Sequence, residues 1–226
     1  MKRMLWRRSS SADSEMNSAE GQKNFLKSPC SFAISFTKIT MQQFKNYPQI
    51  IDGVLPNARQ IPSPHFDQRP DPTDIDLLII HYISLPPEQF GGGFIEDFFQ
   101  GKLDKNAHPY FEEIGDLRVS AHCLIDRQGR VTQFVNFNER AWHAGLSSFE
   151  GREKCNDFAI GIELEGSNEQ PFTDAQYAAL QQLTQQIQQA YPRITNERIV
   201  GHSDVSPGRK IDPGQYFDWP RYLGGL

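Results

Sequence analysis

DFAIGIELE, residues 157–165, is the clearest β-strand pattern in the chain. Side chains along a strand alternate between the two faces of a sheet. One face of this stretch carries large apolar side chains, those of Phe158, Ile160, Ile162 and Leu164. The other face carries two very small residues and two carboxylates, namely Ala159, Gly161, Glu163 and Glu165. We expect the first face to pack on a core and the second to let another group approach the backbone closely.

Two more apolar runs predict strands, and each is followed by a histidine. Residues 77–80 read LLII, which is typical of a strand buried on both faces, and His81 comes next. A shorter run over residues 198–200 leads through Gly201 to His202. Open α/β sheets place their sites at the carboxyl ends of strands, so both histidines are candidate site residues. The plainer alternative for a histidine at a strand end is a hydrogen-bonded core residue.

Helical patterns cover three stretches. Residues 94–99 and 109–117 predict short helices, with Pro109 in the first turn of the second. Thr173 opens a longer helix, because Gln176 completes a capping box, and Pro192 ends it. An apolar stripe at helical spacing consists of Leu180, Leu183, Ile187 and Tyr191. This stripe predicts packing on the core, and the glutamines between its members, including Gln186, are expected to face water.

Residues 119–126 and 130–135 predict a β-hairpin that turns at Gln128 and Gly129. Strict alternation would place Ala121, Cys123 and Ile125 on one face and His122 on the other. His122 either looks into a cleft or hydrogen-bonds within the sheet, and the pattern supports both. The irregular stretch RAWHAG follows at residues 140–145. Its tryptophan, Trp142, either walls a pocket or fills the edge of the core.

Composition limits the classes of protein to which the chain can belong. With 226 residues and a net charge of −5, it is long enough for one full core and lacks the basic footprint of a general nucleic-acid binder. Three scattered cysteines are too few for a disulfide framework and fit a reducing compartment. No apolar run approaches the roughly 20 residues of a membrane-spanning helix, so we expect no stable membrane association.

Residues 1–40 differ from the rest of the chain. They carry seven Lys and Arg against three Asp and Glu, and no periodic pattern persists in them. Such a composition cannot bury enough apolar surface to offset its ordering entropy. We therefore predict a disordered basic tail over residues 1–40 and one domain over residues 41–226. The basic start has no apolar segment behind it and does not read as a secretory signal, which favours a cytoplasmic location.

Residues 201–214 read GHSDVSPGRKIDPG and contain three chemically active side chains, those of His202, Lys210 and Asp212. Proline and glycine at this density forbid a regular helix and predict an ordered loop. A histidine and an aspartate ten positions apart in one loop can aim at a single point, and a metal ion is the obvious occupant. A surface loop with a capping aspartate is the plainer alternative.

A catalytic zinc ion takes three protein ligands and keeps one position open for water. His81, His202 and Asp212 supply two nitrogens and one oxygen for such a site. Three other histidines could compete on spacing alone, and these are His65, His108 and His143.

Two further side chains complete a hydrolytic site. Glu163 can accept a proton from water, and the ammonium of Lys210 suits a developing oxyanion. Together with a metal, these groups predict hydrolysis of an amide or an ester. The alternative for a strand carboxylate is a solvated outward face, which explains Glu165 better than Glu163.

Four ordered blocks of the sequence resemble the AmpD-type N-acetylmuramoyl-L-alanine amidases, which are related to peptidoglycan recognition proteins. The first two blocks are LLIIHYISLPPEQFGGGF from residue 77 and DKNAHPYFEEIGDLRVSAHCLIDRQGR from residue 104. The last two are GREKCNDFAIGIELEG from residue 151 and GHSDVSPGRKIDPG from residue 201. The resemblance runs from about residue 58 to residue 222.

The resemblance implies a single α/β domain with a mixed central β-sheet flanked by helices. It implies one Zn²⁺ per chain on His81, His202 and Asp212, with Glu163 and Lys210 as catalytic residues. Enzymes of this type cleave the amide between the lactyl group of 1,6-anhydro-N-acetylmuramic acid and L-alanine, in cytoplasmic peptidoglycan recycling. We accordingly expect a small-molecule muropeptide substrate and a monomer.

Three positions depart from the residues usual in this family. Tyr82 stands in place of an asparagine, which puts one polar contact with the substrate in doubt. Lys154 stands in place of an arginine and loses the bidentate fork for a carboxylate. Ile211 stands in place of a threonine. Four residues are expected to contact the muropeptide, namely Arg118, Lys154, Trp142 and Tyr110.

Two other classes of function share parts of the pattern. A peptidoglycan-binding module of the same fold binds without cleavage, but binding-only relatives lose a zinc ligand, and here all three are present. A zinc hydrolase that acts on ordinary peptides is the second alternative, and only the resemblance weighs against it.

Overall fold

The structure is a computed structural model that describes residues 48–226. The predicted disordered tail over residues 1–40 lies outside the described residues, and the domain boundary at residue 41 stays a prediction.

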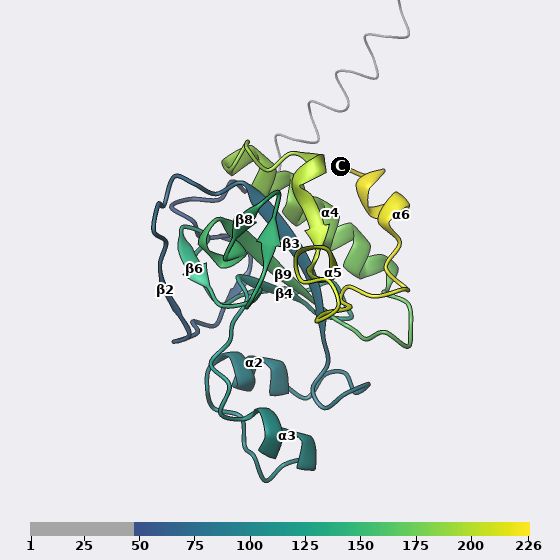
Figure 1. The fold of residues 1–226 in the computed structure, drawn as a ribbon. Helices are drawn as coiled ribbons and strands as arrows, with labels where there is room; N and C mark the ends of the chain where they lie inside the picture. Colours follow the sequence, from purple (N-terminus) through teal and green to yellow (C-terminus); the bar gives the residue numbers. More distant parts are fainter. Residues whose placement is uncertain (1–47) are drawn as a thin grey trace, which may run out of the picture. The chain divides into compact units, whose positions relative to one another are not determined.

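A six-stranded sheet forms the centre of the described part of the chain, in the order β1-β5-β4-β9-β3-β10 (Figure 1). Its strands are β1 (Arg59–Gln60), β3 (Leu77–Ile83), β4 (Cys123–Ile125), β5 (Val131–Gln133), β9 (Ala159–Glu165) and β10 (Ile199–Gly201). β9 lies between β3 and β4 and runs parallel to both, whereas β4 and β5 are antiparallel. The mixed sheet that the family resemblance implied is therefore confirmed.

Helices and two small sheets surround this centre. The helices are α2 (Phe94–Phe99), α3 (Pro109–Ile114), α4 (Asp174–Ala190), α5 (His202–Val205) and α6 (Trp219–Leu223), with short 3-10 helices at Cys155–Asp157 and Asn196–Arg198. The small sheets pair β2 (Phe66–Gln68) with β6 (Glu139–Ala141), and β7 (Ser148–Phe149) with β8 (Arg152–Glu153). Within residues 48–226, none of the helices is long and apolar enough to cross a membrane.

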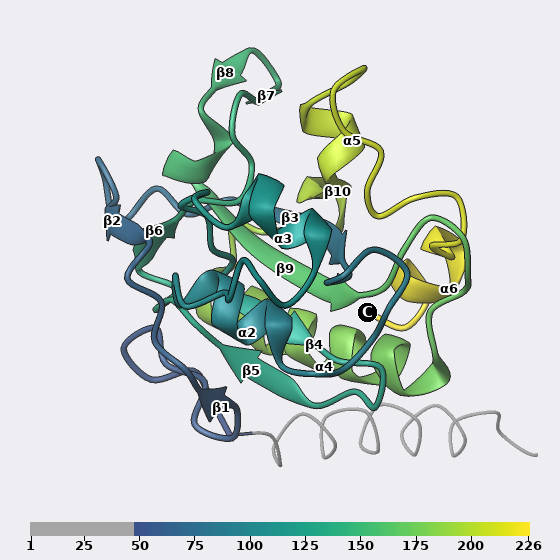
Figure 2. The same ribbon diagram turned by 90° about the horizontal axis from the view of Figure 1, so that it is seen from below.

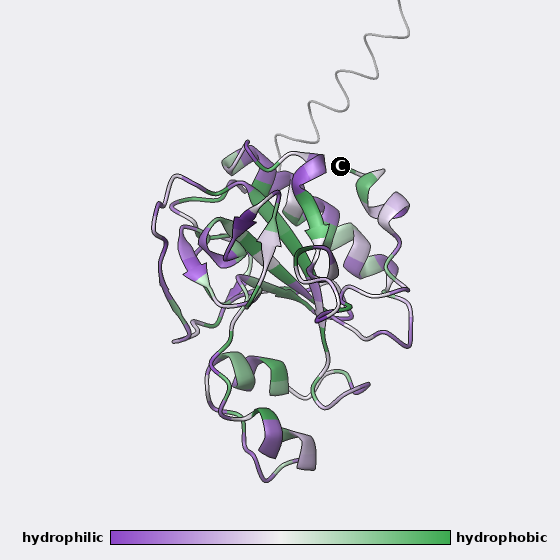
Figure 3. Ribbon diagram, viewed as in Figure 1, coloured by the Kyte–Doolittle hydropathy of each residue, from purple (hydrophilic) through white to green (hydrophobic). Residues whose placement is uncertain are grey.

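The longest helix within residues 48–226, α4, covers one face of the sheet. Its apolar stripe packs with the alternating strand residues Ile160, Ile162 and Leu164, as the sequence predicted. The capping box of Thr173 and Gln176 is also present. Figure 3 shows the resulting contrast between the apolar central strands and the more polar outer segments.

One glutamine of α4 contradicts the prediction that these residues face water. Gln186 is only 7 % exposed, and its side-chain amide donates to the Pro48 carbonyl. The segment before β1 therefore crosses this part of the helix and needs a buried hydrogen-bond donor there.

Phe158 does not share a face with Ile160 as predicted. The strand begins only at Ala159, and Phe158 is the residue that closes the preceding 3-10 helix. Its ring packs with Ala159 and Val205 in a smaller core on the opposite face of the sheet.

The predicted hairpin is present but shorter, because the chain bends at His122. The His122 carbonyl accepts from two successive amides, Phe134 at 2.9 Å and Val135 at 3.5 Å, which breaks the ladder in the manner of a β-bulge. As a result Ala121 packs in the same cluster as Leu124, not with Cys123.

A third apolar cluster joins α2 and α3 to the end of the sheet, where both helices lie close together (Figure 2). The helix predicted over residues 109–117 ends at Ile114, three residues early, and Gly115 follows as its C-cap. The remaining residues to Leu117 belong to the irregular link toward β4.

Candidate metal centre and cavity

His81 and His202 come from neighbouring parallel strands. β3 and β10 pair Ile80 with Gly201, so the next residue of each chain segment is a histidine at the same edge. Both imidazole rings are buried. The sequence predicted both histidines at the carboxyl ends of strands. This holds for His202, whereas β3 continues for two residues beyond His81.

His202 is the first residue of α5, so the prediction that residues 201–214 contain no helix is wrong over its first turn. The Gly201 amide donates to Asp204 Oδ2 at 2.7 Å, which caps the start of this turn. Pro207 and Gly208 lie beyond its end, and the rest of the stretch is irregular as predicted.

The irregular part returns Asp212 to the two histidines. Asp212 Oδ2 lies 3.0 Å from His81 Nδ1 and 2.9 Å from His202 Nδ1, and the two Nδ1 atoms are 3.0 Å apart. Three potential ligand atoms are thus mutual neighbours in a buried cluster that could hold a metal ion.

The orientation of the His202 ring fits a metal ion between these atoms. Its Nε2 lies 3.0 Å from the Ala144 carbonyl oxygen, which can only accept, so Nε2 carries the ring proton. Nδ1 is then the nitrogen that can offer a lone pair to a metal ion, and it faces a carboxylate oxygen of Asp212. Two nitrogens and one oxygen in this arrangement fit Zn²⁺ with its fourth position open.

Burial and mutual contacts set the charges of this cluster. Burial lowers the pKa of His81 to about 4, so this ring is neutral near pH 7. Burial by itself would raise the pKa of Asp212, but the contacts with His202 and His81 outweigh it and hold that pKa well below its usual range. A carboxylate and a neutral imidazole are the protonation states that metal binding requires.

Glu163 lies directly beside the cluster. The parallel register of β3 and β9 pairs it with His81, and its side chain is buried. Burial raises the pKa of its carboxyl group well above the usual value, the charge of Asp212 adds to this, and Lys210 opposes it. Among the described residues, its Oε2 atom has no hydrogen-bond partner. The carboxylate is therefore free to bind a proton or a water molecule.

Lys210 is exposed but borders the same cavity as Glu163 and the three potential ligands. This cavity has a volume of about 380 Å³. Apolar side chains from α2, α3 and the link after α3 form one wall, including Phe98, Ile114 and Leu117. A polar cluster at the bottom and an apolar wall suit a ligand with both characters.

The structure brings together only part of the expected substrate contacts. Tyr110 and Trp142 line the cavity, and so does Tyr82. Trp142 therefore walls a pocket, and its indole N–H donates to Asp67 at 3.0 Å. Arg118 is exposed and does not line the cavity, although its chain neighbours Leu117 and Val119 do. Lys154 lines a separate hollow together with Arg209. The role of all four expected residues in substrate binding stays a prediction.

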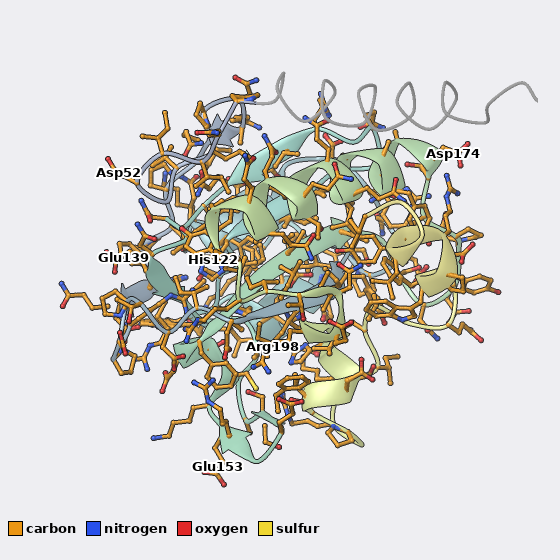
Figure 4. All side chains as sticks on the ribbon, turned by 90° about the horizontal axis from the view of Figure 1, so that it is seen from above. Asp52, His122, Glu139, Glu153, Asp174 and Arg198 are labelled. Atoms are coloured by element: carbon orange, nitrogen blue, oxygen red, sulfur yellow. The ribbon has the colours of Figure 1, made fainter. Side chains whose placement is uncertain are left out.

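The other histidines have separate places. His108 caps α3, and His65 stacks on Trp142. His122 is inside the protein, as Figure 4 shows, where its Nδ1 accepts from the Gly161 amide at 3.0 Å. The two possibilities for His122 are thus resolved in favour of a hydrogen bond within the sheet.

His143 is the residue for which sequence reasoning found no role beyond that of a competing ligand. Its Nδ1 lies 3.0 Å from His81 Nε2, on the side of the ring that faces away from His202 and Asp212. Burial and the neighbouring His81 and His122 lower the pKa of His143 well below the usual value. Trp142 and His143 within RAWHAG mark this segment in the sequence, but only the fold shows that His143 Nδ1 contacts His81 Nε2.

A buried cluster of three potential ligands beside a carboxylate, on a mixed sheet, is the arrangement of a hydrolase site that could hold a metal ion. The family model described as N-acetylmuramoyl-L-alanine amidase matches residues 71–215, and the chain belongs to this family. It is 74% identical, over 174 residues, to the 1,6-anhydro-N-acetylmuramyl-L-alanine amidase AmpD of Haemophilus influenzae, a match that covers 77% of this chain and 95% of that protein. The AmpD of Citrobacter freundii is 54% identical over 171 residues, which are 76% of this chain and 91% of that protein.

Solved structures show the same similarity. A crystal structure of a selenomethionine AmpD derivative superposes with a TM-score of 0.77 at 51% identity, covering 79% of this chain and 99% of the other. The amidase AmiD of Escherichia coli superposes with a TM-score of 0.51 at 32% identity, covering 67% and 57%. That structure is a complex with the substrate anhydro-N-acetylmuramic acid-L-Ala-D-γ-Glu-L-Lys.

Proposed function

We propose that this chain is a zinc-dependent amidase that acts on 1,6-anhydro-muropeptides. It hydrolyses the amide between the lactyl group of the anhydro sugar and the L-alanine of the stem peptide. The observation that carries the proposal is the convergence of His81, His202 and Asp212 next to a buried Glu163. The names of the relatives and the muropeptide bound to AmiD support the choice of substrate.

His81, His202 and Asp212 would hold the zinc ion. Zinc in such a site polarises a carbonyl oxygen and lowers the pKa of a bound water toward about 7. One carboxylate among three ligands leaves the site with a net positive charge, which favours an anionic transition state.

Glu163 acts as the general base in this proposal. Its carboxylate takes the proton of the attacking water and then returns it to the alanine nitrogen as the amide bond breaks. The raised pKa of the buried carboxyl group supports this role, because the group must hold the proton between the two transfers.

Lys210 stabilises the oxyanion of the tetrahedral intermediate. Its ammonium borders the cavity from the loop that also carries Asp212, so charge and position both suit an oxygen that gains negative charge. Trp142 and Tyr110 offer flat apolar surfaces to the sugar or the peptide, and Tyr82 lines the same cavity.

The proposal includes the cellular location and the oligomeric state of the enzyme. We assign the enzyme to cytoplasmic recycling of peptidoglycan fragments, in keeping with the function of AmpD-type amidases. One chain supplies every group of the proposed site, so it acts as a monomer, which light scattering coupled to size-exclusion chromatography tests.

One incubation tests the reaction. Zinc-loaded protein is mixed with purified 1,6-anhydro-N-acetylmuramoyl tripeptide, and release of the free tripeptide is followed by mass spectrometry. A chelator-treated sample and Glu163→Gln run in parallel. Release in the first sample alone supports the proposal. Substrate that stays bound but intact on the zinc-loaded protein would instead identify a binding module.

A further inference from the structure

The short segment between β6 and β7 touches both histidines of the candidate metal centre. His143 Nδ1 lies 3.0 Å from His81 Nε2, and the Ala144 carbonyl oxygen lies 3.0 Å from His202 Nε2. Each ring thus directs one nitrogen at the centre and its other nitrogen at this segment. We propose that His143 is a positioning residue, whose Nδ1 accepts the Nε2–H of His81 and holds that ring with Nδ1 toward the metal.

The direction of this hydrogen bond follows from the ligand geometry. His81 Nδ1 faces His202 and Asp212, so a metal there takes the Nδ1 lone pair and leaves the ring proton on Nε2. Nε2–H needs an acceptor, and His143 Nδ1 is placed to accept. This step rests on the proposed zinc function, because only a bound cation fixes the Nδ1 lone pair of His81.

His143 keeps its orientation although this leaves one of its own atoms unpaired. When Nδ1 accepts, the ring proton of His143 lies on Nε2, which is buried and has no partner among the described residues. Buried polar atoms without partners are rare in folded proteins, and each one calls for an explanation. We explain this atom by the hydrogen bond from His81 to His143 Nδ1, which leaves the ring proton of His143 on Nε2.

Two features of the surrounding chain determine where the His143 ring lies. A Cβ atom on Gly161 would lie 2.5 Å from His143 Cγ and Nδ1, so only glycine leaves room for the ring at this point of β9. The Asn156 side-chain oxygen accepts from the amides of His143 and Ala144, at 3.2 and 2.8 Å. One amide group therefore fixes the backbone that supplies both acceptors.

A neutral imidazole differs from the carboxylate that often supports a metal-bound histidine. A carboxylate would add a second negative charge beside Asp212 and reduce the positive charge of the centre. His143 orients His81 without this effect. The arrangement preserves the electrophilic character that amide hydrolysis requires.

The test compares His143→Asn with His143→Leu. Asparagine can place its Oδ1 near the position of Nδ1, whereas leucine has a similar shape and no acceptor. The zinc Kd is measured by competition with a chromophoric chelator. We expect the leucine variant to bind zinc about 10–100-fold more weakly and the asparagine variant to recover most of this loss. His65→Leu is the matched control, since His65 contacts Trp142 and none of the three ligands.

Two further readouts protect the test against misfolding. Circular dichroism of the zinc-free variants reports whether they fold. Gly161→Ala reaches the same ring from the strand, and we expect it to weaken zinc binding in the same direction. In ¹⁵N spectra of the zinc-loaded wild type, His81 should show a protonated Nε2 whose exchange with water accelerates in His143→Leu.

The outcomes separate the two proposals. A folded His143→Leu protein that binds zinc as tightly as the wild type, with unchanged His81 exchange, overturns the positioning role and leaves the zinc function intact. A wild type that binds no zinc overturns both. Weaker binding in His65→Leu, equal to that of His143→Leu, would also reject a specific role for His143.

Discussion

His81 and Glu163 are register partners across the parallel strands β3 and β9. The sheet itself therefore sets a potential metal ligand and a potential general base side by side. Because side chains alternate along a strand, a slip of one residue in this pairing would turn Glu163 to the opposite face, toward α4. The chemistry of the site depends on this register as much as on the identity of the residues.

Glu163→Gln is expected to abolish most of the amidase activity while the protein still binds zinc. The substitution keeps the volume and removes the basic oxygen, so the rate should fall about 10²–10⁴-fold. Initial rates with the anhydro-muropeptide and zinc content by atomic absorption measure the two effects. Loss of zinc together with activity would show that Glu163 is structural.

Lys210→Ala is expected to lose about 10²–10³-fold in kcat with little change in stability, since it removes one donor to the oxyanion. The side chain is exposed, and its loss should leave the zinc Kd unchanged. Ile211→Thr, at the adjacent and exposed position, is the control that should keep the wild-type rate. An unaltered kcat in Lys210→Ala contradicts the assigned role.

Zinc is expected to stabilise the folded chain through the three-ligand cluster. Free zinc at 1,000 times its Kd adds about 4 kcal/mol to the free energy of unfolding when it binds only the native state. Thermal melting with and without a chelator measures the shift. In Asp212→Asn, which keeps the shape and removes the charge, the shift should largely disappear. An equal shift in this variant would place the zinc elsewhere.

Acid is expected to destabilise the zinc-free protein from about pH 6.5 downward, which begins above the pKa of ordinary carboxylates. Burial lowers the pKa of His122 to about 3, and the nearby Arg69 adds to this, whereas an exposed histidine has a pKa near 6.5. Between these values the unfolded chain binds a proton that the folded chain does not, so the free energy of unfolding falls as the pH falls. For this proton the slope is about 1.4 kcal/mol per pH unit.

Chemical denaturation at pH 7, 5.5 and 4.5 measures this slope in chelator-treated protein. His122→Asn retains an acceptor for the Gly161 amide and removes the titrating ring, so its slope should be smaller by about one proton. Equal slopes for the variant and the wild type would mean that His122 is protonated in the folded state.

Leu180→Ala is expected to lower the free energy of unfolding by about 2–5 kcal/mol, because Leu180 is fully buried between α4 and the sheet. Zinc affinity should not change, since the side chain lies on the face away from the metal centre. Gln189→Ala, on the exposed side of the same helix, should stay within about 0.5 kcal/mol of the wild type. Urea denaturation of the three proteins gives the comparison.

Local patterns in the sequence were sufficient for much of the fold. The alternation around Ile162 and the capping box at Thr173 each depend on near neighbours, and both are present as predicted. Prediction from the sequence failed where contacts between distant segments determine the burial of a side chain or the path of a strand. Gln186 is buried by a segment more than a hundred residues away, and the bend at His122 depends on hydrogen bonds to other strands.

The residues of the candidate site also differ in how far the sequence predicts them. The family resemblance was enough to select His81, His202 and Asp212, and the structure places their ligand atoms together. The contact of His143 with His81 joins residues 62 positions apart and depends on the room left by Gly161. Spacing carries no record of such a contact, so His143 remained one competing histidine among three.

β3 lies between β9 and β10, although both of these strands follow it in the sequence. During synthesis on the ribosome, His81 emerges long before its strand has either neighbour. The nascent chain therefore passes through a long stage in which one histidine of the trio is present without the other two ligands. If these three residues hold the proposed zinc ion, the complete ligand set exists only after residue 212 has left the exit tunnel, so metal acquisition would be a late event in the biogenesis of the protein.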